Sequence, residues 1–466
     1  MIESYLKRNG YALAGRGRPK EIPVWEQWYK GFVPEFHRYW VQCGEGRRIQ
    51  AERFRAGMAK VICQDFGSLL VNEHVQVTSD ALGDDLTRVL QKNKFHTRMN
   101  RLAELTMALG TGAVVVYKGA DGEPVIDYIG ARMIYPLRWD NENVTECAFA
   151  SPCIIGQGRE AKEGLYIQAH VKQGDAWVVR NALLNSAGKE EPLPDGVLEE
   201  SPPSPVPLFY LVRPNSVNTA EPQSPMGASV FADAIDQLKA TDIVYDSYIN
   251  EFVLGKKRLL VPLSLATMIG NKDGTLEPIF DPNDALFYTY ADGTESDAKR
   301  LTEVDMHLRI AEHDQGMQTQ INFLSKKCGL GMNRYKFDAG VIQTAKEVIS
   351  SQSDLYQSLK RHEKTFGDAI IGLVKAIGFL LGRDLEAVDA SVAFDDSIIE
   401  DTDATSNRVI RLVGAGLMSK KRALMELYKL DEQEAEKRMD EILRESRMNQ
   451  EAVENAMYNA DASGDL

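Results

Sequence analysis

The chain has 466 residues, too many for one hydrophobic core, and its 44% hydrophobic and 26% charged content is ordinary for a foldable globular protein. Its net charge of −14 argues against a protein that binds nucleic acid non-specifically, because binding DNA normally requires basic residues that displace counterions. No stretch reaches the ~20 apolar residues of a membrane span, and the first 20 residues lack the apolar core of a secretory signal.

Charge is unevenly distributed along the chain. Residues 1–60 carry twelve Lys or Arg against six Glu, whereas residues 431–466 carry four Lys or Arg against eleven Asp or Glu. The five cysteines form no CxxC pair, which indicates buried thiols in a reducing compartment.

Within the first 224 residues, the spacing of apolar residues changes once from a helical to a strand-like pattern. Residues 1–45 are rich in Gly, Arg, Trp and Tyr and predict an irregular basic arm. Apolar spacing of three and four then predicts helices over 49–71, 81–91 and 97–109. After that, alternating patterns predict a β-meander over 113–139 and a hairpin of 165–171 with 176–184, followed by a proline-rich loop over 190–207.

The middle of the chain predicts a helical hairpin with a decorated tip. Ser224 and Pro225 are typical of a helix start, and an apolar stripe continues from there to Gly255. A second helix is predicted over Met306–Cys328. The roughly 50 residues between the two helices contain the strand-like segments RLLVP and ALFYTY.

Thr344–Leu381 is the longest periodic segment. It contains no proline, and its stripe residues predict a single helix roughly 55 Å long at about 1.5 Å per residue. We expect so long a helix not to be buried within one compact domain. A short strand over Val388–Phe394 and a helical C-terminal region are predicted after it.

Five segments in this half of the chain carry a resemblance to a known family. TAKEVISSQSDLYQSLKRHE, from Thr344, resembles the TATEV-type signature of portal proteins from long-tailed bacteriophages of Gram-positive hosts. FDDSIIEDTDA and VGAGLMSKKRALMELYKLDEQEA follow in the family's order, and FVLGKKRLLVP with FDPNDALFYTY precedes it. Together these blocks span most of the chain from Gly227 to Ala435.

The resemblance implies an α+β portal fold with an α/β wing, a two-helix stem, a small α/β clip and a C-terminal helical crown. The corresponding regions are the basic arm (1–45), wing (46–224), first stem helix (225–257), clip (258–305), second stem helix (306–328), tunnel-loop region (329–343), long wing helix and strand (344–395) and crown (396–466).

The resemblance also implies a function without catalysis. Portal proteins are rings, usually of twelve copies, at one vertex of the virion capsid, where they conduct double-stranded DNA during packaging and ejection. The implied partners are further copies of the chain, the terminase large subunit, head-completion or adaptor proteins, and the major capsid and scaffolding proteins, with assembly in the host cytoplasm. Neither a membrane nor a cofactor is implied. A ring also gives the apolar stripes a partner, because contacts that close by rotation bury faces that a lone hairpin would expose.

Basic residues cluster where the resemblance places the narrowest part of the channel. Around the tunnel loop, the residues expected to line it are Lys326, Lys327, Arg334, Lys336 and Lys346. A second cluster of Lys256, Lys257 and Arg258 lies at the end of the first stem helix. An alternative interpretation is that these are solvated charges at helix ends.

Two other functions remain open on the residues alone. GRGRPK (Gly15–Lys20) matches the core of an AT-hook, which would make the chain a DNA-binding protein using its arm. The acidic residues between Asp395 and Asp403 could ligate a divalent cation, as in a metal-dependent nuclease, although helix capping explains them more simply. No HExxH, GxxxxGK[ST] or Ser/His/Asp pattern stands out.

Overall fold

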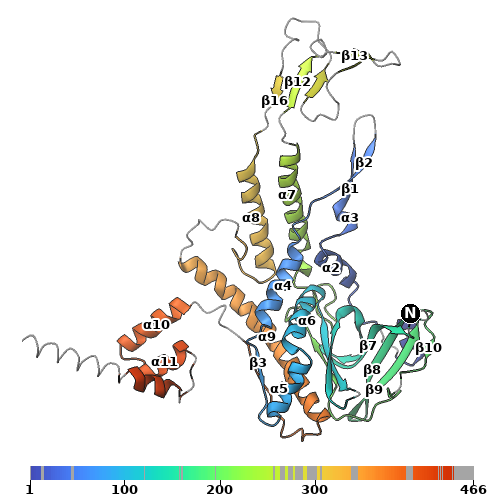
Figure 1. Cartoon of the computed structure of the whole chain (residues 1–466), viewed down its shortest axis with the longest axis vertical. Helices are drawn as coiled ribbons and strands as arrows, with labels where there is room; N and C mark the ends of the chain where they lie inside the picture. The colour runs from blue at the N-terminus through green and yellow to red at the C-terminus, as the bar shows by residue number, and fades with distance from the viewer. Residues whose placement is uncertain are drawn as a thin grey trace, which may run out of the picture. The chain divides into compact units, whose positions relative to one another are not determined.

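The fold is given by a computed structural model (Figure 1). It describes residues 2–11, 15–42, 47–119, 121–156, 158, 161–194, 196–254, 307–336, 345–394 and 402–428, with short segments within 258–304 and 430–444. Side chains are described in these residues except over 254–304, 345–353, 402–405 and at 407. The chain divides into two compact units, Met1–Asp395 and Asp396–Leu466, which are described separately.

The N-terminal segment is folded, which corrects the irregular structure expected for residues 1–45. It contains helices α1 (Ile2–Arg8), α2 (Ile22–Tyr29) and α3 (Pro34–His37), followed by strand β1 (Arg38–Gln42). The indole rings of Trp25 and Trp28 in α2 are buried. Burying two such large side chains provides enough apolar contact to order a segment that lacks a long periodic pattern.

The helix predicted over 49–71 is present only in its second half. Residues Arg48–Glu52 form strand β2, which pairs antiparallel with β1 in a two-stranded ribbon, and helix α4 begins at Met58 and ends at Leu70. Between them, the backbone amides of Phe54 and Ala56 donate to side-chain carboxylates of a distant helix. The predicted helices over 81–91 and 97–109 are confirmed as α5 (Gly83–Lys92) and α6 (Phe95–Leu109).

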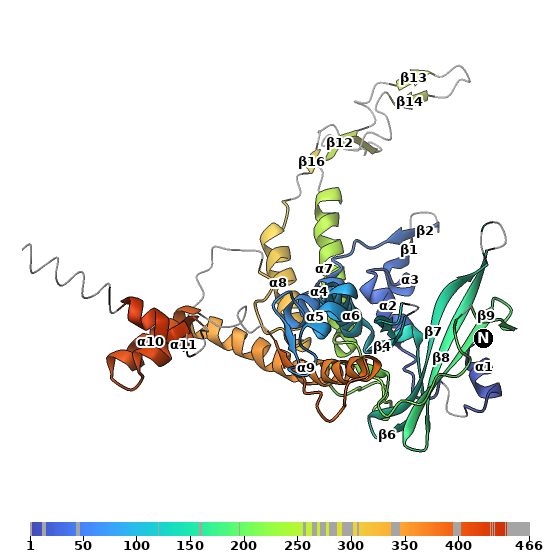
Figure 2. The ribbon, with the colours of Figure 1, turned by 60° about the horizontal axis from the view of Figure 1, so that its bottom comes forward.

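The strands between residues 112 and 212 form two antiparallel sheets, and the segment predicted as one meander is divided between them. The three-stranded sheet has the order β11-β4-β5, from Phe209–Val212, Gly112–Lys118 and Pro124–Gly130. A 3₁₀ turn over Ala131–Met133 then carries the chain into a second sheet, which corrects the predicted meander. That sheet has the order β10-β9-β8-β7-β6, from Glu190–Glu191, Ala176–Asn185, Lys162–Gln173, Asn143–Ile155 and Ile134–Asp140 (Figure 2).

The hairpin of β8 and β9 confirms its prediction, with Ala169 opposite Arg180. Strand β7 was missed because its burial does not alternate and Pro152 interrupts its pattern. Helix α1 packs against this five-stranded sheet, where Ile2 and Leu6 join a buried cluster that includes Ala148 and Leu184.

Two helices form the hairpin expected in the middle of the chain. They are α7 (Ile235–Leu254) and α8 (Ile310–Lys327), which pack against each other along their lengths (Figure 1). The first begins about ten residues later than predicted, after a 3₁₀ turn at Ala232–Ala234. The Ser224 hydroxyl, expected as its cap, instead donates to the Gly17 carbonyl (2.5 Å) and accepts from the Met226 amide (3.1 Å).

Short strands connect the two helices. Strand β12 (Arg258–Pro262) pairs in parallel with β15 (Phe287–Tyr290) and antiparallel with β16 (Thr302–Val304). A separate pair is formed by β13 (Met268–Gly270) and β14 (Leu276–Pro278). The strand-like segments RLLVP and ALFYTY therefore do form strands.

Helix α9 (Ala345–Leu380) confirms the long helix, but not the expectation that it could not be buried in one domain. Its stripe residues from Leu355 to Ile377 are buried within this unit, where α9 packs against α4, β4 and β11. The Tyr210 ring lies so close to Gly372 that a Cβ there would meet it at 2.1 Å. After α9, strand β17 (Ser391–Ala393) pairs with β3 (Gln76–Thr78), which confirms a short strand in this region.

In the second unit, helices α10 (Thr402–Gly414) and α11 (Lys420–Tyr428) pack together, as expected for a helical C-terminal region. Val409 and Ala423 are buried, and Arg408 forms an ion pair with Glu426. Gly416 takes a φ of 71° in the turn between the helices, a backbone conformation that favours glycine.

Candidate functional site: the α7–α8 hairpin and the loop after it

The hairpin of α7 and α8 is joined at its outer end by one carboxylate. Glu251 accepts hydrogen bonds from Arg309 Nε (3.0 Å), Arg309 Nη2 (2.9 Å) and the Arg309 amide (3.3 Å). These bonds lower the pKa of Glu251 to about 2, because they stabilise its charged form. His313 Nε2 lies 3.6 Å from the same carboxylate. The two helices are therefore fastened together where the chain leaves for residues 258–304.

Close packing holds the rest of the hairpin. A Cβ added to Gly316 on α8 would lie 3.7 Å from the Val244 side chain on α7, so Gly316 lies where the two helices come close to each other. At the inner end, Leu238, Ile321 and Leu324 are buried. Lys327 Nζ donates to the Asp233 carbonyl at 2.9 Å.

Part of the hairpin's apolar surface is left exposed by the described residues of the unit. Six large apolar side chains on or beside these helices are between 40% and 53% exposed: Ile243, Phe252, Val253, Leu308, Ile310 and Phe323. A pair of helices that exposes this many large apolar groups presents a surface typical of protein–protein contact.

The loop after α8 turns back into the fold. Gly329 ends the helix at a φ of 84°, and a Cβ there would meet Ser358 Oγ of α9 at 2.5 Å. The Leu330 amide donates to the Ser325 carbonyl at 3.0 Å, which satisfies a carbonyl of the last helical turn. Only glycine provides both the backbone conformation and the close approach to α9.

Asp65 on α4 anchors this loop. Its two carboxylate oxygens accept from Arg334 Nε (2.9 Å) and Nη2 (3.1 Å), and the Tyr335 hydroxyl donates to Oδ2 at 2.9 Å. Burial is the main cause that raises the pKa of Tyr335, with a further contribution from the Asp65 charge. A bidentate Arg–carboxylate pair fixes orientation as well as distance, so residues up to 336 are held in place just before residues 337–344.

The structure gives the predicted channel cations different surroundings. Arg334 is paired with Asp65, and Lys327 donates to a backbone carbonyl. Lys326 and Lys336 are exposed, with no ion pair to a carboxylate among the described residues. The side chains of Lys346 and Arg258 lie outside the described residues, as do Lys256 and Lys257 entirely.

Three buried groups at the base of the hairpin were not identified from the sequence. His37 on α3 is fully buried, and its Nε2 lies 3.1 Å from Asp242 Oδ2 on α7. Asp242 also accepts the Ala56 amide (2.8 Å), and Asp246 accepts the Phe54 amide (2.9 Å). The available signal was a pair of carboxylates at i and i+4 on the apolar face of α7, where polar groups require partners.

The alternative sites receive no support where they are described. In the AT-hook-like segment, Arg18 donates to the Tyr135 hydroxyl (3.1 Å) and the Arg132 carbonyl (2.8 Å), and Pro225 packs over Gly17. The residues of the acidic cluster, Asp395–Asp403, lie outside the described residues or have no described side chain. Elsewhere in the described part of the chain, no three His, Cys, Asp or Glu side chains gather as a metal site would require.

Comparison with known proteins identifies the fold's relatives. A family model described as "Phage portal protein, SPP1 Gp6-like" matches residues 19–452. No curated protein matches the chain. Among the described residues, none of the helices has both the length and the apolar character needed to cross a bilayer.

Proposed function

Because the chain belongs to the SPP1 Gp6-like family of phage portal proteins, we propose that twelve copies form a ring at one capsid vertex. Portal proteins are structural components of the capsid vertex that serve DNA packaging, and the family match extends over nearly the whole chain. In this ring, DNA enters the head during packaging and leaves through the same opening during ejection.

The observation that carries the ring proposal is the exposed apolar surface of the α7–α8 hairpin. Phe323 is 53% exposed and Ile243 is 47% exposed, on helices whose opposite faces are already packed. Contact between identical copies related by rotation would bury such surfaces on every subunit at once. Obligate interfaces commonly bury ~2,000–5,000 Å², so the association would be strong.

We assign the parts of the portal as follows. The hairpin of α7 and α8 is the stem, and the strands between them belong to the clip, which would contact the terminase large subunit first and head-completion proteins later. The sheets and α9 form the wing. The wing and the N-terminal segment would together contact the capsid and scaffolding proteins. The second unit is the crown, and residues 329–343 form the tunnel loop.

The charge distribution supports a channel that guides DNA without retaining it. Lys326 and Lys336 are exposed cations at the two ends of the anchored loop. Repeated around a ring, they would make weak, screened contacts with phosphates, whereas the net charge of −14 would oppose tight binding. In this proposal Arg334 has a structural role, because its guanidinium is already held by Asp65.

The portal would act through its shape and surface rather than through catalysis. Packaging consumes ATP, and we assign that reaction to the terminase that docks on the clip. Assembly would take place in the host cytoplasm, before the ring becomes part of the virion.

Negative-stain imaging of the purified full chain tests the proposal. We expect rings with a central hole wide enough for a duplex. The double variant Ile243→Arg/Phe323→Arg should yield fewer rings, because charge replaces the exposed apolar contacts. Gln315→Arg, also on an exposed position of α8, serves as the matched control and should leave ring yield unchanged. Uniform small particles from the wild-type chain would contradict the proposal.

A further inference from the structure

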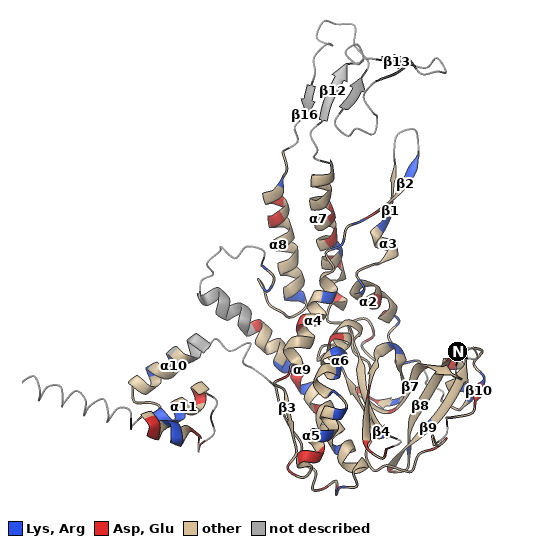
Figure 3. Ribbon diagram, viewed as in Figure 1, with Lys and Arg blue, Asp and Glu red and all other residues tan. Residues whose placement is uncertain are grey.

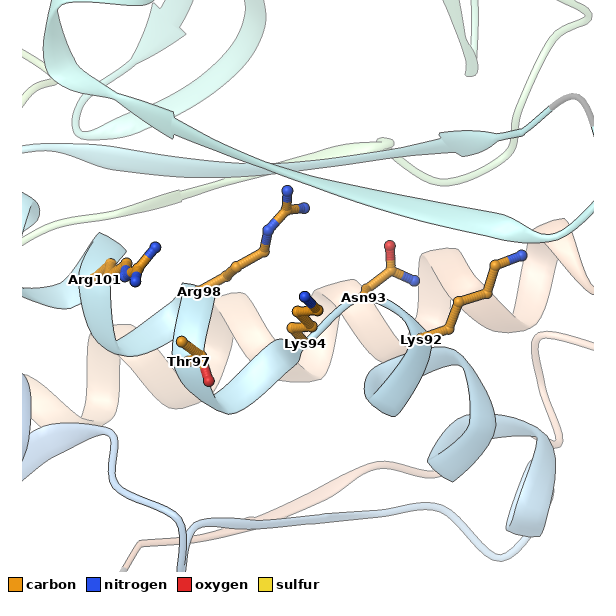
Figure 4. Close-up of a pocket in the computed structure, with 6 residues that line it drawn as sticks. All are labelled: Lys92, Asn93, Lys94, Thr97, Arg98 and Arg101. Carbon is orange, nitrogen blue, oxygen red and sulfur yellow. The ribbon is translucent and has the colours of Figure 1, made fainter.

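A basic pocket lies where α5 passes into α6, away from the α7–α8 hairpin. It has a volume of about 380 Å³ and is lined by Lys92, Asn93, Lys94, Thr97, Arg98 and Arg101. Figure 4 shows the long side chains of Arg98 and Lys92 extending from the helices toward the neighbouring strands. Four of its six lining residues are cations.

The floor of the pocket is rigid. Asn93 is buried, and its amide donates to the Val89 carbonyl (2.9 Å) and the Pro124 carbonyl (3.0 Å) and accepts from the Ile126 amide (2.9 Å). This side chain fixes the turn between the helices to strand β5. The cations on either side of it are therefore presented from a fixed backbone.

Three of the cations have no ion pair among the described residues. Lys92 pairs with Asp121, but no described carboxylate lies within ion-pair distance of Lys94, Arg98 or Arg101. The guanidinium of Arg98 lies over the Tyr128 ring, 5.7 Å from its centroid. Burial raises the pKa of the Asp127 carboxyl group, and the nearby positive charge of Arg98 partly offsets this effect. Positive charge is thus concentrated here although the net charge of the chain is −14. Figure 3 shows blue segments along α6.

These cations are unfavourable for the helix that carries them. Arg98 and Arg101 are three residues apart on one face of α6, and Lys94 is the residue directly before the helix, so three like charges stand close together and repel one another. Lys94 and Arg98 also lie at the N-terminal end of α6, where the helix dipole favours negative charge, and the first turn contains no acid. Local arrangements that oppose the stability of their own element are expected mainly where they serve a function.

We propose that this pocket is a docking site for an acidic peptide segment of a partner protein. Arginine guanidinium groups bind carboxylates in a bidentate manner, and two of the three unpaired cations are arginines. The stripe from Lys94 to Arg101 spans roughly 10 Å at about 1.5 Å per residue. An extended peptide advances ~3.3 Å per residue, so a run of about four acidic residues covers this length, with alternate side chains facing the pocket. This inference does not depend on ring formation.

A peptide fits the pocket better than a DNA duplex does. The pocket is concave, and its size of about 380 Å³ suits a few side chains rather than the convex surface of a duplex. The Asp121 carboxylate beside Lys92 would also repel a continuous row of phosphates. A short acidic run, in contrast, can place its carboxylates on the three unpaired cations only.

Fluorescence anisotropy of a labelled octaglutamate peptide with the full-length chain at low salt tests the proposal. We expect saturable binding that weakens as salt increases, and an affinity at least tenfold lower for Arg98→Gln/Arg101→Gln. Arg16→Gln removes an exposed arginine elsewhere and should leave the affinity unchanged. Octaglutamine, which has the same length without charge, should not bind.

A second variant separates loss of binding from loss of fold. Thr97→Glu places a carboxylate in the first turn of α6, three residues after Lys94 and four before Arg101. The new carboxylate should pair with the neighbouring cations of the protein itself and weaken octaglutamate binding at least tenfold. The midpoint of thermal unfolding should be unchanged or higher. The proposal would be overturned if both variants bound octaglutamate with the wild-type affinity, or if the wild-type chain did not bind octaglutamate at all. A 20-base-pair duplex that binds more tightly than the peptide and loses affinity with the same variants would also overturn it.

Discussion

His37 Nε2 lies 3.1 Å from Asp242 Oδ2 and joins residues 205 positions apart in the chain. The Val33 amide donates to His37 Nδ1 at 2.8 Å, which favours the tautomer in which Nε2 carries the proton and donates to the carboxylate. Because Asp242 lies on α7 and also accepts the Ala56 amide, this contact ties the base of the β1–β2 ribbon to the hairpin.

Asp242→Ala should therefore destabilise the first unit. The substitution leaves the buried His37 N–H and the Ala56 amide without acceptors, at a cost on the order of 3 kcal/mol. Asp236→Ala, on the same helix, removes a carboxylate that is 86% exposed and pairs with Lys239, and it should change stability little. Urea unfolding followed by tryptophan fluorescence measures both. Equal midpoints for the two variants would show that the His37–Asp242 contact is not stabilising.

Asp65→Ala should release the loop that precedes residues 337–344. Arg334 and Tyr335 both lose their acceptor, so backbone amides of residues 328–336 should exchange with solvent faster. Gln64→Ala changes the exposed neighbour on α4 and should leave exchange as in the wild type. Hydrogen–deuterium exchange with mass spectrometry distinguishes the two. Unchanged protection of the loop in Asp65→Ala would contradict its role as an anchor.

Gly110→Ala should be strongly destabilising. Gly110 has a φ of 81°, and a Cβ there would lie 2.4 Å from the Gly227 carbonyl oxygen, so both backbone conformation and space exclude a side chain. Gly31→Ala is a matched control, because Gly31 has a similar φ of 75° with nothing within 4 Å of the added Cβ. It should cost only about 1 kcal/mol of backbone strain. Thermal unfolding should give a clearly lower midpoint for Gly110→Ala than for the control, and the reverse order would contradict this packing.

Acid should destabilise the protein through its buried histidines. The His170 ring packs edge-on against the Phe149 and Phe209 rings, and neither of its nitrogens has a hydrogen-bond partner among the described residues. Burial lowers the pKa of His170 from 6.5 to about 3. Burial likewise lowers the pKa of His362 to about 4. The folded state therefore favours both neutral rings, and this contribution is complete above pH 6.5. It declines as the pH falls below 6.5, by up to about 1.4 kcal/mol per unit for each histidine.

His170→Leu should reduce this acid sensitivity. Removing the buried imidazole should leave stability at pH 7 unchanged or higher, because two unpartnered nitrogens are lost, and the loss between pH 6.5 and pH 4 should become smaller. His74→Gln alters an exposed histidine and should follow the wild type. Urea midpoints at pH 7, 5.5 and 4.5 provide the comparison. Parallel pH profiles for the wild type and His170→Leu would contradict the burial of a neutral His170.

Long regular patterns were the part of the fold that could be predicted from the sequence. Helix α9 was identified almost to its ends because its stripe repeats over more than thirty residues, and the β8–β9 hairpin was recognised from its alternation and turn. The interpretation of α9 was nevertheless wrong in one respect. Its periodicity indicated an apolar face, but not that β4, β11 and α4 of the same unit would cover that face.

The failures concern short segments and distant partners. Ser224 and Pro225 looked like a helix start, but the Ser224 hydroxyl bonds to Gly17, which lies 207 positions away. Helical spacing predicted a helix from residue 49, yet pairing with β1 makes residues 49–52 a strand. Asp65 and Arg334 are 269 positions apart, so no local pattern could show that one of the predicted channel cations would be neutralised by a carboxylate of α4.

Native mass spectrometry of the purified full-length chain counts the copies in a closed assembly. If the chain forms a portal ring, the dominant species should contain twelve copies of the 52.0 kDa chain, or a closely similar number, and should persist on dilution. A population that remains at the mass of a single chain at high protein concentration would contradict ring formation.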